Sequence, residues 1–131
     1  MKIAALIARI LLALMFLIFG FNGFLHFIPS PPPPPGLAAQ FAGALYMSHY
    51  LVAVFLVQIV GGALLLVRRY VPLALILLGP IVVNILLFHL LLSPAGAAPG
   101  VLAAVLWIVV FISVRDAFSA ILTPQKQSLT S

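Results

Sequence analysis

Four long apolar stretches alternate with short polar or proline-rich segments along the chain. At a rise of ~1.5 Å per residue, each stretch is long enough to cross the ~30 Å hydrocarbon core of a bilayer as a helix. The pattern predicts membrane spans at about residues 3–24, 50–67, 71–92 and 100–118. We therefore expect an all-α integral membrane four-helix bundle formed by residues 1–122 as one domain, followed by a polar cytoplasmic tail at residues 123–131.

The longest break in the pattern lies between the first two spans. Pro29 ends the first helix, and the run Pro31–Pro35 predicts an extended polyproline II rod, because proline fixes φ and lacks a backbone donor. At ~3.1 Å per residue these prolines cover about 15 Å, enough to cross the top of a bundle. Leu37, Phe41 and Leu45 then recur every four residues, which predicts a short helix lying at the outer membrane interface.

Charged residues fall at alternate ends of the predicted spans, and the opposite ends carry none. They are Lys2, Arg9, Arg68, Arg69, Arg115, Asp116 and Lys126. Because Lys and Arg are retained on the cytoplasmic side of membrane proteins, we expect both termini in the cytoplasm and the proline-rich loop outside. Arg9 lies within the first span, where it can snorkel to the interface or form an ion pair with Asp116, the only carboxylate side chain.

Composition supports a membrane protein and excludes several other classes. Hydrophobic residues make up 66% of the 131 residues and charged residues 5%, more apolar surface than a small soluble domain can bury. The net charge of +5 lies beside the spans, so topology and anionic lipids explain it and no nucleic-acid partner is expected. The chain has no cysteine, which excludes thiolate metal sites and iron–sulfur clusters.

Three polar side chains lie deep within the predicted spans. Gln58, Asn84 and Trp107 are each about eight residues from an outer span end, hence about 12 Å deep at ~1.5 Å per residue. In one interpretation they hydrogen-bond one another and hold the bundle together, at ~0.6–2 kcal/mol per contact. In the other they line a small pocket for the polar head of a lipid-soluble ligand.

All three histidines lie near the outer ends of the predicted spans. His26, His49 and His89 come from different spans, and Asn22 shares a helix face with His26 at i, i+4. An imidazole can bind a metal or haem, shuttle a proton, or hydrogen-bond a quinone carbonyl. It can equally present its apolar body to the bundle and its polar tip to lipid headgroups. No H-x-x-x-H spacing supports metal or haem.

These polar groups converge on one leaflet, so we expect an outward-opening pocket. Its candidate residues are Asn22, His26, His49, Gln58, Asn84, His89 and Trp107. The sequence names no cofactor and disfavours a metal, while a quinone suits the pocket. With no nucleophile–base pair and no metal signature, we do not expect an autonomous enzyme.

Several blocks of the sequence resemble the DoxX family of small four-span bacterial membrane proteins. The blocks are Arg9–Gly20 with Asn22, Phe27–Pro29, Gln58 with Gly61 and Gly62, Arg69–Leu75, and Pro80–His89. Gly23 departs from the pattern, since many relatives carry a lysine after the asparagine of the first span. The family takes its name from a subunit associated with archaeal quinone-linked sulfur oxidation. The resemblance therefore implies a bacterial inner-membrane location and a link to membrane redox chemistry.

Three functional hypotheses follow from the sequence. The first is an accessory subunit that binds a quinone or lipid-like ligand in a membrane redox or oxidative-stress assembly. The second is a structural or assembly protein without a ligand. The third is a small-molecule transporter that acts as a dimer, with Gly20 or Gly61 and Gly62 at a close helix contact. In each case the expected partners are the lipid bilayer, other membrane or periplasmic proteins, or further copies of the chain.

Overall fold

The computed structural model describes residues 2–125, and its regular elements over that range are all helical. In chain order they are α1 (Lys2–Leu25), α2 (Leu37–Met47), α3 (Tyr50–Leu66), α4 (Val71–Leu91), η1 (Pro94–Gly96), α5 (Ala98–Val114), η2 (Arg115–Phe118) and α6 (Ser119–Leu122). Each apolar stretch of the sequence forms one of the long helices α1, α3, α4 and α5, with ends close to those expected. Most of the expected polar tail, residues 126–131, lies outside the described range.

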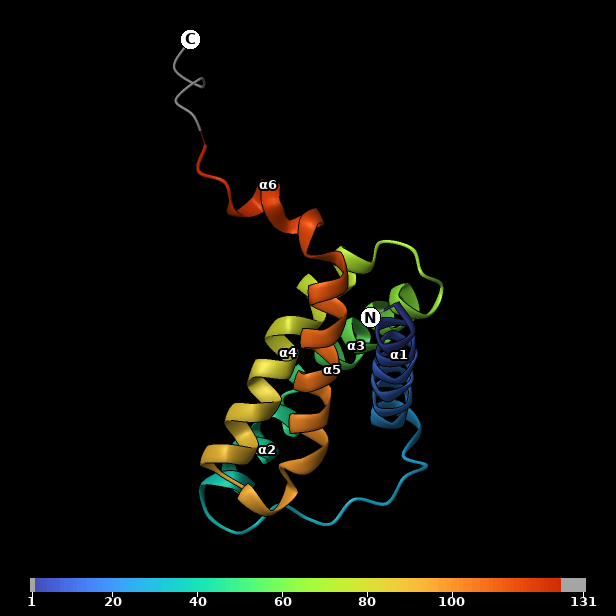
Figure 1. The fold of residues 1–131 in the computed structure, drawn as a ribbon. Helices are drawn as coiled ribbons and strands as arrows, with labels where there is room; N and C mark the ends of the chain where they lie inside the picture. Colours follow the sequence, from blue (N-terminus) through green and yellow to red (C-terminus); the bar gives the residue numbers. More distant parts are fainter. Residues whose placement is uncertain (1, 126–131) are drawn as a thin grey trace.

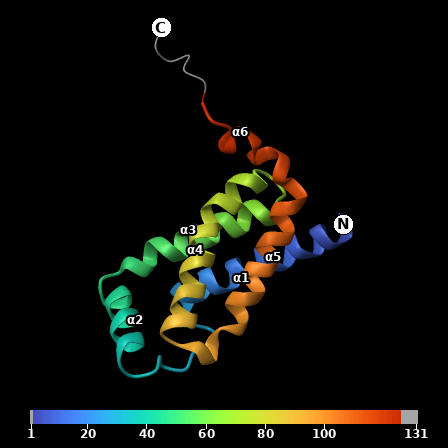
Figure 2. The same cartoon turned by 60° about the vertical axis from the view of Figure 1, so that its left-hand side comes forward.

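The long helices pack around a common core in the order in which the chain visits them. α1 and α4 each pack against both α3 and α5, so every long helix has two neighbours. Consecutive helices run in opposite directions, which places the start of α1, the α3–α4 turn and α6 at one end (Figure 1). α1 and α3 are inclined to α4 and α5 (Figure 2). The basic residues of these segments therefore gather at one end of the bundle.

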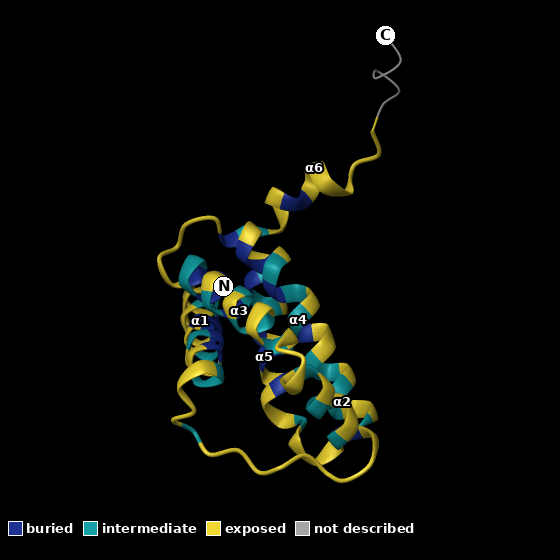
Figure 3. Ribbon diagram, turned by 180° about the vertical axis from the view of Figure 1, so that it is seen from behind, coloured by how far each residue is buried: buried dark blue, intermediate teal, exposed yellow. Residues whose placement is uncertain are grey.

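The core is made mainly of aliphatic side chains from all four long helices, together with Phe16 and Phe118. Leu12, Leu65, Leu75, Leu78 and Val110 are fully buried. Much of the outward surface of the long helices is exposed (Figure 3). Many of its exposed residues are large and apolar, as expected where lipid replaces water as the solvent. Exposed residues at helical spacing include Ile7, Leu11, Leu14 and Ile18 on α1, Leu56 and Val60 on α3, and Val101, Val105, Ile108 and Ile112 on α5.

The lengths and compositions of the helices suit a multi-pass membrane protein. Lys2–Leu25, Val71–Leu91 and the continuous segment Ala98–Leu122 are each long and apolar enough to cross a membrane. A fourth crossing arises if α2 and α3, which meet at a bend of 80°, are taken as one broken span. The described chain thus holds three to four candidate spans.

The connection between α1 and α2 contains no helix from residue 26 to residue 36. It carries the chain across the end of the bundle to the far side, where α2 begins (Figure 1). Gly36 permits the turn into α2 because its φ of 98° lies in a region that side chains avoid. The expected short helix is present as α2. However, Ala38 is its buried residue, whereas Leu37 and Phe41 are exposed.

Glycines allow α3 to approach its neighbours closely. A Cβ at Gly62 would lie 3.1 Å from the carbonyl oxygen of Ala13 and 3.2 Å from the amide nitrogen of Leu17, both backbone atoms of α1. A Cβ at Gly20 or at Gly61 would likewise meet side chains of α3 and of α4, respectively. These glycines serve contacts within one chain. The close helix contact expected at these glycines is thus present within the chain, and a contact between two copies stays a prediction.

Trp107 of α5 forms a hydrogen bond to α4 near a proline in that helix. α4 continues through Pro80, which cannot donate a backbone hydrogen bond. The indole Nε1 of Trp107 donates to the carbonyl oxygen of Leu75, in the turn before Pro80, at 3.0 Å. Its ring stacks on Phe111, with ring centroids 5.4 Å apart and 7° between planes. Trp107 thus supplies a donor to a part of α4 where the helical ladder is weakened.

We expect Trp107→Phe to destabilise the protein by about 1–2 kcal/mol, because the aromatic ring is kept while the donor to Leu75 is lost. Thermal unfolding of the purified protein in detergent measures this. Phe111→Leu is the companion variant, since it removes the stacking partner but leaves the indole donor in place. A Trp107→Phe variant as stable as the original protein would show that the hydrogen bond contributes nothing.

Candidate functional site

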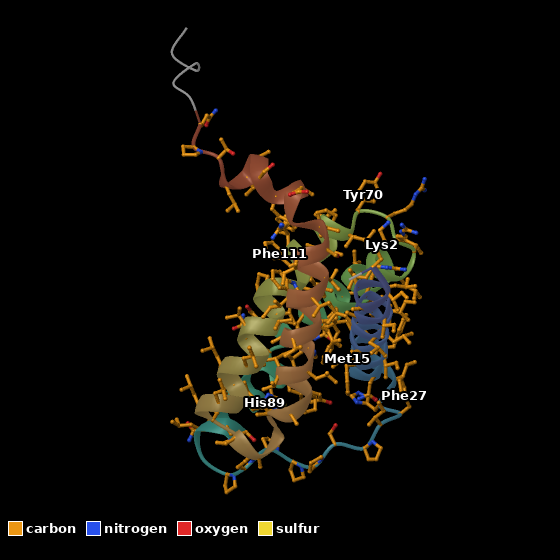
Figure 4. The ribbon with its side chains drawn as sticks, viewed as in Figure 1. Lys2, Met15, Phe27, Tyr70, His89 and Phe111 are labelled. Carbon is orange, nitrogen blue, oxygen red and sulfur yellow. The ribbon has the colours of Figure 1, made fainter. Side chains whose placement is uncertain are left out.

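A half-enclosed pocket of about 290 Å³ opens where the four long helices meet, toward the end of the bundle that carries His89. Figure 4 shows His89 and Phe27 toward this end, with Lys2 and Tyr70 toward the other. The pocket is lined by Met15, Phe16 and Phe19 of α1, Gln58 of α3, Ile85 and His89 of α4, Gly96 of η1, and Pro99, Gly100 and Ala103 of α5. Apart from the amide and the imidazole, its side chains are apolar.

Gln58 is the one polar residue in the buried core of the described chain, with 6% of its surface exposed. Its Oε1 is buried and has no hydrogen-bond partner within residues 2–125. A buried polar atom without a partner costs about 1–3 kcal/mol, so such atoms are uncommon in folded proteins. Gln58 lines the pocket, and a polar group placed there is the natural partner for its amide.

His89 presents one ring nitrogen to its own helix and the other toward the α4–α5 connection. Its Nδ1 lies 2.9 Å from the carbonyl oxygen of Ile85, and because a carbonyl only accepts, Nδ1 carries the hydrogen. Its Nε2 lies next to Gly96, 3.2 Å from where a Cβ on that residue would stand. In the neutral ring, Nε2 is therefore a hydrogen-bond acceptor at the pocket wall.

The expected convergence of the histidines is wrong. His26 and His49 are exposed, with φ of 53° and 61°, and each follows a helix end where the chain turns. Asn22 does not join them, because its Oδ1 accepts a hydrogen bond of 2.7 Å from the amide of Ile28 and closes the end of α1. Across residues 2–125 there is no group of three or more His, Cys, Asp or Glu side chains that could hold a metal ion.

The expected hydrogen bonding among Gln58, Asn84 and Trp107 is also wrong. Asn84 is exposed on α4, and its Nδ2 donates to the carbonyl oxygen of Pro80 on the same helix at 2.8 Å. Trp107 uses its only donor on Leu75 and does not line the pocket. Helix rotation explains the difference: counting residues gives depth, but not which face of a helix turns inward.

Arg9 does not form an ion pair with Asp116, which was one of the two roles that its position in the sequence allowed. Its guanidinium instead donates to the carbonyl oxygens of Leu65 and Leu66, the latter at 3.2 Å. These carbonyls end α3, where the helical hydrogen-bond ladder stops and the helix dipole leaves partial negative charge. The backbone amide of Arg68 also donates to Leu65, at 3.2 Å. Asp116 is exposed in η2, beyond the end of α5. Arg9 therefore caps the neighbouring helix.

Of the candidate pocket residues, the structure brings together Gln58 and His89. Sequence reasoning missed the apolar wall from α1 and the small residues Gly96, Gly100 and Ala103, which leave room for the cavity. Close spacing of small residues at the start of α5 was the available signal.

A comparison with models of known protein families, with curated proteins and with solved structures finds no significant match to this chain.

Proposed function

We propose that this chain is a DoxX-like, four-span protein of the bacterial inner membrane that binds the head of a quinone or lipid-like amphiphile between its helices. It would act as an accessory, non-catalytic subunit of a membrane redox or oxidative-stress assembly. The observation that carries the proposal is Gln58, whose Oε1 is buried and unpartnered, on the wall of a pocket that also contains His89. The redox context rests on the family resemblance alone.

Packing supports α3 as a span. At ~1.5 Å per residue its 17 residues cover about 26 Å, near the lower limit for crossing a bilayer. It packs along α1 and α4, which are both long and apolar enough to span. A helix that packs along two membrane-spanning helices lies at the same depth in the bilayer. The basic residues at the other end of the bundle favour cytoplasmic termini.

The absence of cysteine from the chain allows a direct topology test. We expect Ser30→Cys, in the connection before α2, to react with a membrane-impermeant maleimide added to intact cells. Ser119→Cys, at the start of α6, should react only after the membrane is opened. Both serines are exposed, so access to the reagent is limited by the membrane alone. The reverse labelling pattern would show the inverted orientation.

The pocket's size limits what can enter it. A volume of about 290 Å³ lies just below the ~300–1,000 Å³ typical of sites for drug-sized ligands, so it suits a single ring or a headgroup. Phe16 and Phe19 offer flat apolar surfaces for such a ring. A long tail would have to leave through the open side of the pocket into lipid.

The hydrogen-bonding groups favour a ligand that donates. With Nδ1 bound to Ile85, a neutral His89 offers only an acceptor. The Oε1 of Gln58 is enclosed, so it becomes a second acceptor once the amide turns toward the cavity. A quinol carries two hydroxyl donors, one for each acceptor, whereas a quinone carries only acceptors. A quinone would need the His89 ring to be protonated or the amide nitrogen of Gln58 to face the cavity.

Titration of the purified protein at pH 8 with decylubiquinol and with decylubiquinone, followed by the fluorescence of the single tryptophan, tests this proposal. We expect the quinol to bind more tightly, and His89→Leu to weaken it about tenfold, the value of one hydrogen bond of ~1.4 kcal/mol. Asn84→Leu, on the exposed face of the same helix, is the matched control and should bind normally. Equal binding by all three proteins would refute a role for His89.

A further inference from the structure

A second, larger pocket of about 550 Å³ lies at the basic end of the bundle, away from the end that carries His89 (Figure 4). It is lined by Lys2, Ala5, Leu6 and Arg9 of α1, Arg68 of the α3–α4 turn, Val71 of α4, and Val110, Ser113 and Val114 of α5. Figure 4 places Lys2 at this end, close to the turn that carries Tyr70. Three of its nine lining residues are cationic, and none is acidic.

Arg9 gives this pocket a positioned cation. Its Nη1 donates to the last carbonyl groups of α3, and these hydrogen bonds hold the guanidinium at the basic end of the bundle. A guanidinium carries five N–H groups, so those on Nε and Nη2 remain beyond the ones used by Nη1. Planar N–H pairs of this kind suit phosphate oxygens. Arg9 is half-buried, whereas Lys2 and Arg68, which line the same pocket, are exposed.

The remaining walls are aliphatic. Leu6, Val71, Val110 and Val114 provide an apolar surface beside the cations. The hydroxyl of Ser113 donates to the carbonyl oxygen of Val110 at 2.6 Å, so its hydrogen is already used. A free inorganic anion would pair with the cations but would make no contact with these apolar walls. An anionic amphiphile would pair with the cations and also cover the walls.

We infer that this pocket binds one anionic phospholipid, with its phosphate between Lys2, Arg9 and Arg68 and an acyl chain along the aliphatic walls. The inference is independent of the proposed function, because it shares no lining residue with the Gln58 pocket. Charge complementarity supports the choice of ligand. The site carries three cations in a chain whose single carboxylate, Asp116, is not among its lining residues. A bound lipid would join α1, the α3–α4 turn and α5.

The test uses the whole protein, reconstituted with phosphatidylglycerol or with phosphatidylcholine and examined by native mass spectrometry. We expect one phosphatidylglycerol to be retained and phosphatidylcholine to be lost. Lys2→Gln and Arg68→Gln should each weaken retention about fivefold, the effect of one cation near an anionic lipid. Arg9→Gln should weaken it at least as much. Because Arg9 also caps α3, the first two variants keep the test valid if that one fails to fold.

Arg69→Gln is the matched control, because Arg69 neighbours Arg68 and carries the same charge but does not line the pocket. It should retain the lipid normally. If Arg69→Gln and Arg68→Gln weaken retention equally, the attraction is diffuse and the site is refuted. Displacement of the lipid by inorganic phosphate at millimolar concentration would also overturn the inference, because it would show that the cations alone determine binding.

Discussion

Gln58→Leu is expected to make the ligand-free protein more stable by about 1 kcal/mol, although it replaces a polar side chain that a membrane bundle would normally use as a contact. The reason is that Oε1 of Gln58 is buried without a partner, so leucine removes an uncompensated desolvation cost and keeps similar volume. For a chain of this size that corresponds to a rise of roughly 3–6 °C in Tm. The same variant should lose quinol binding by at least about tenfold, because the ligand loses its partner.

These two effects have opposite signs, which distinguishes a binding site from a structural contact. If Gln58 held the helices together, its replacement would lower Tm. Asn84→Leu is the matched control for both measurements, since its amide is exposed and bonded within its own helix. We expect that variant to change neither Tm nor quinol binding measurably. A Gln58→Leu protein with a lower Tm and unchanged binding would support the assembly hypothesis instead.

Gly62→Val is expected to be the most damaging single substitution in the bundle. Its Cβ would stand 3.1 Å from the Ala13 carbonyl oxygen and 3.2 Å from the Leu17 amide nitrogen, and helix backbone cannot rotate away as a side chain can. α1 and α3 would have to separate along their shared contact. We expect a loss of about 2–3 kcal/mol or more, typical of overpacked cores, measured by thermal unfolding in detergent.

Gly43→Val is the matched control for this substitution. Gly43 lies within α2, and a Cβ added there would have no neighbour within 4 Å. Gly43→Val and Gly62→Val both replace a helical glycine with a β-branched residue, so their effects on helix propensity are the same. Any difference in Tm between them therefore comes from packing. We expect its Tm to stay close to that of the original protein. Equal losses at both positions would mean that α1 and α3 are not in close contact.

The sequence predicted the helices well because their signal is simple. A run of apolar residues about 20 long, bounded by charge, proline or glycine, has few alternatives to a long helix. The ends of α1, α3 and α4 fall within one or two residues of those expected. The short helix after the prolines was also predicted, although not which of its faces packs against the protein.

The candidate site was harder to predict because helices that are apolar all round carry no amphipathic signal. Nothing in the sequence of α4 distinguishes the face of Asn84, which is exposed, from that of His89, which lines the pocket. Arg9 shows the same difficulty. Its partners are backbone carbonyls of α3, which every helix end possesses, so no residue pattern reveals them.

The pocket containing Gln58 and His89 is expected to hold an amphiphile in the cell. Native mass spectrometry of the protein released directly from its own membranes tests it, because the mass separates a quinol or quinone from a phospholipid. We predict one quinol- or quinone-sized molecule per chain on the original protein and on Asn84→Leu, and none on Gln58→Leu. Identical spectra for the original protein and Gln58→Leu would contradict the claim.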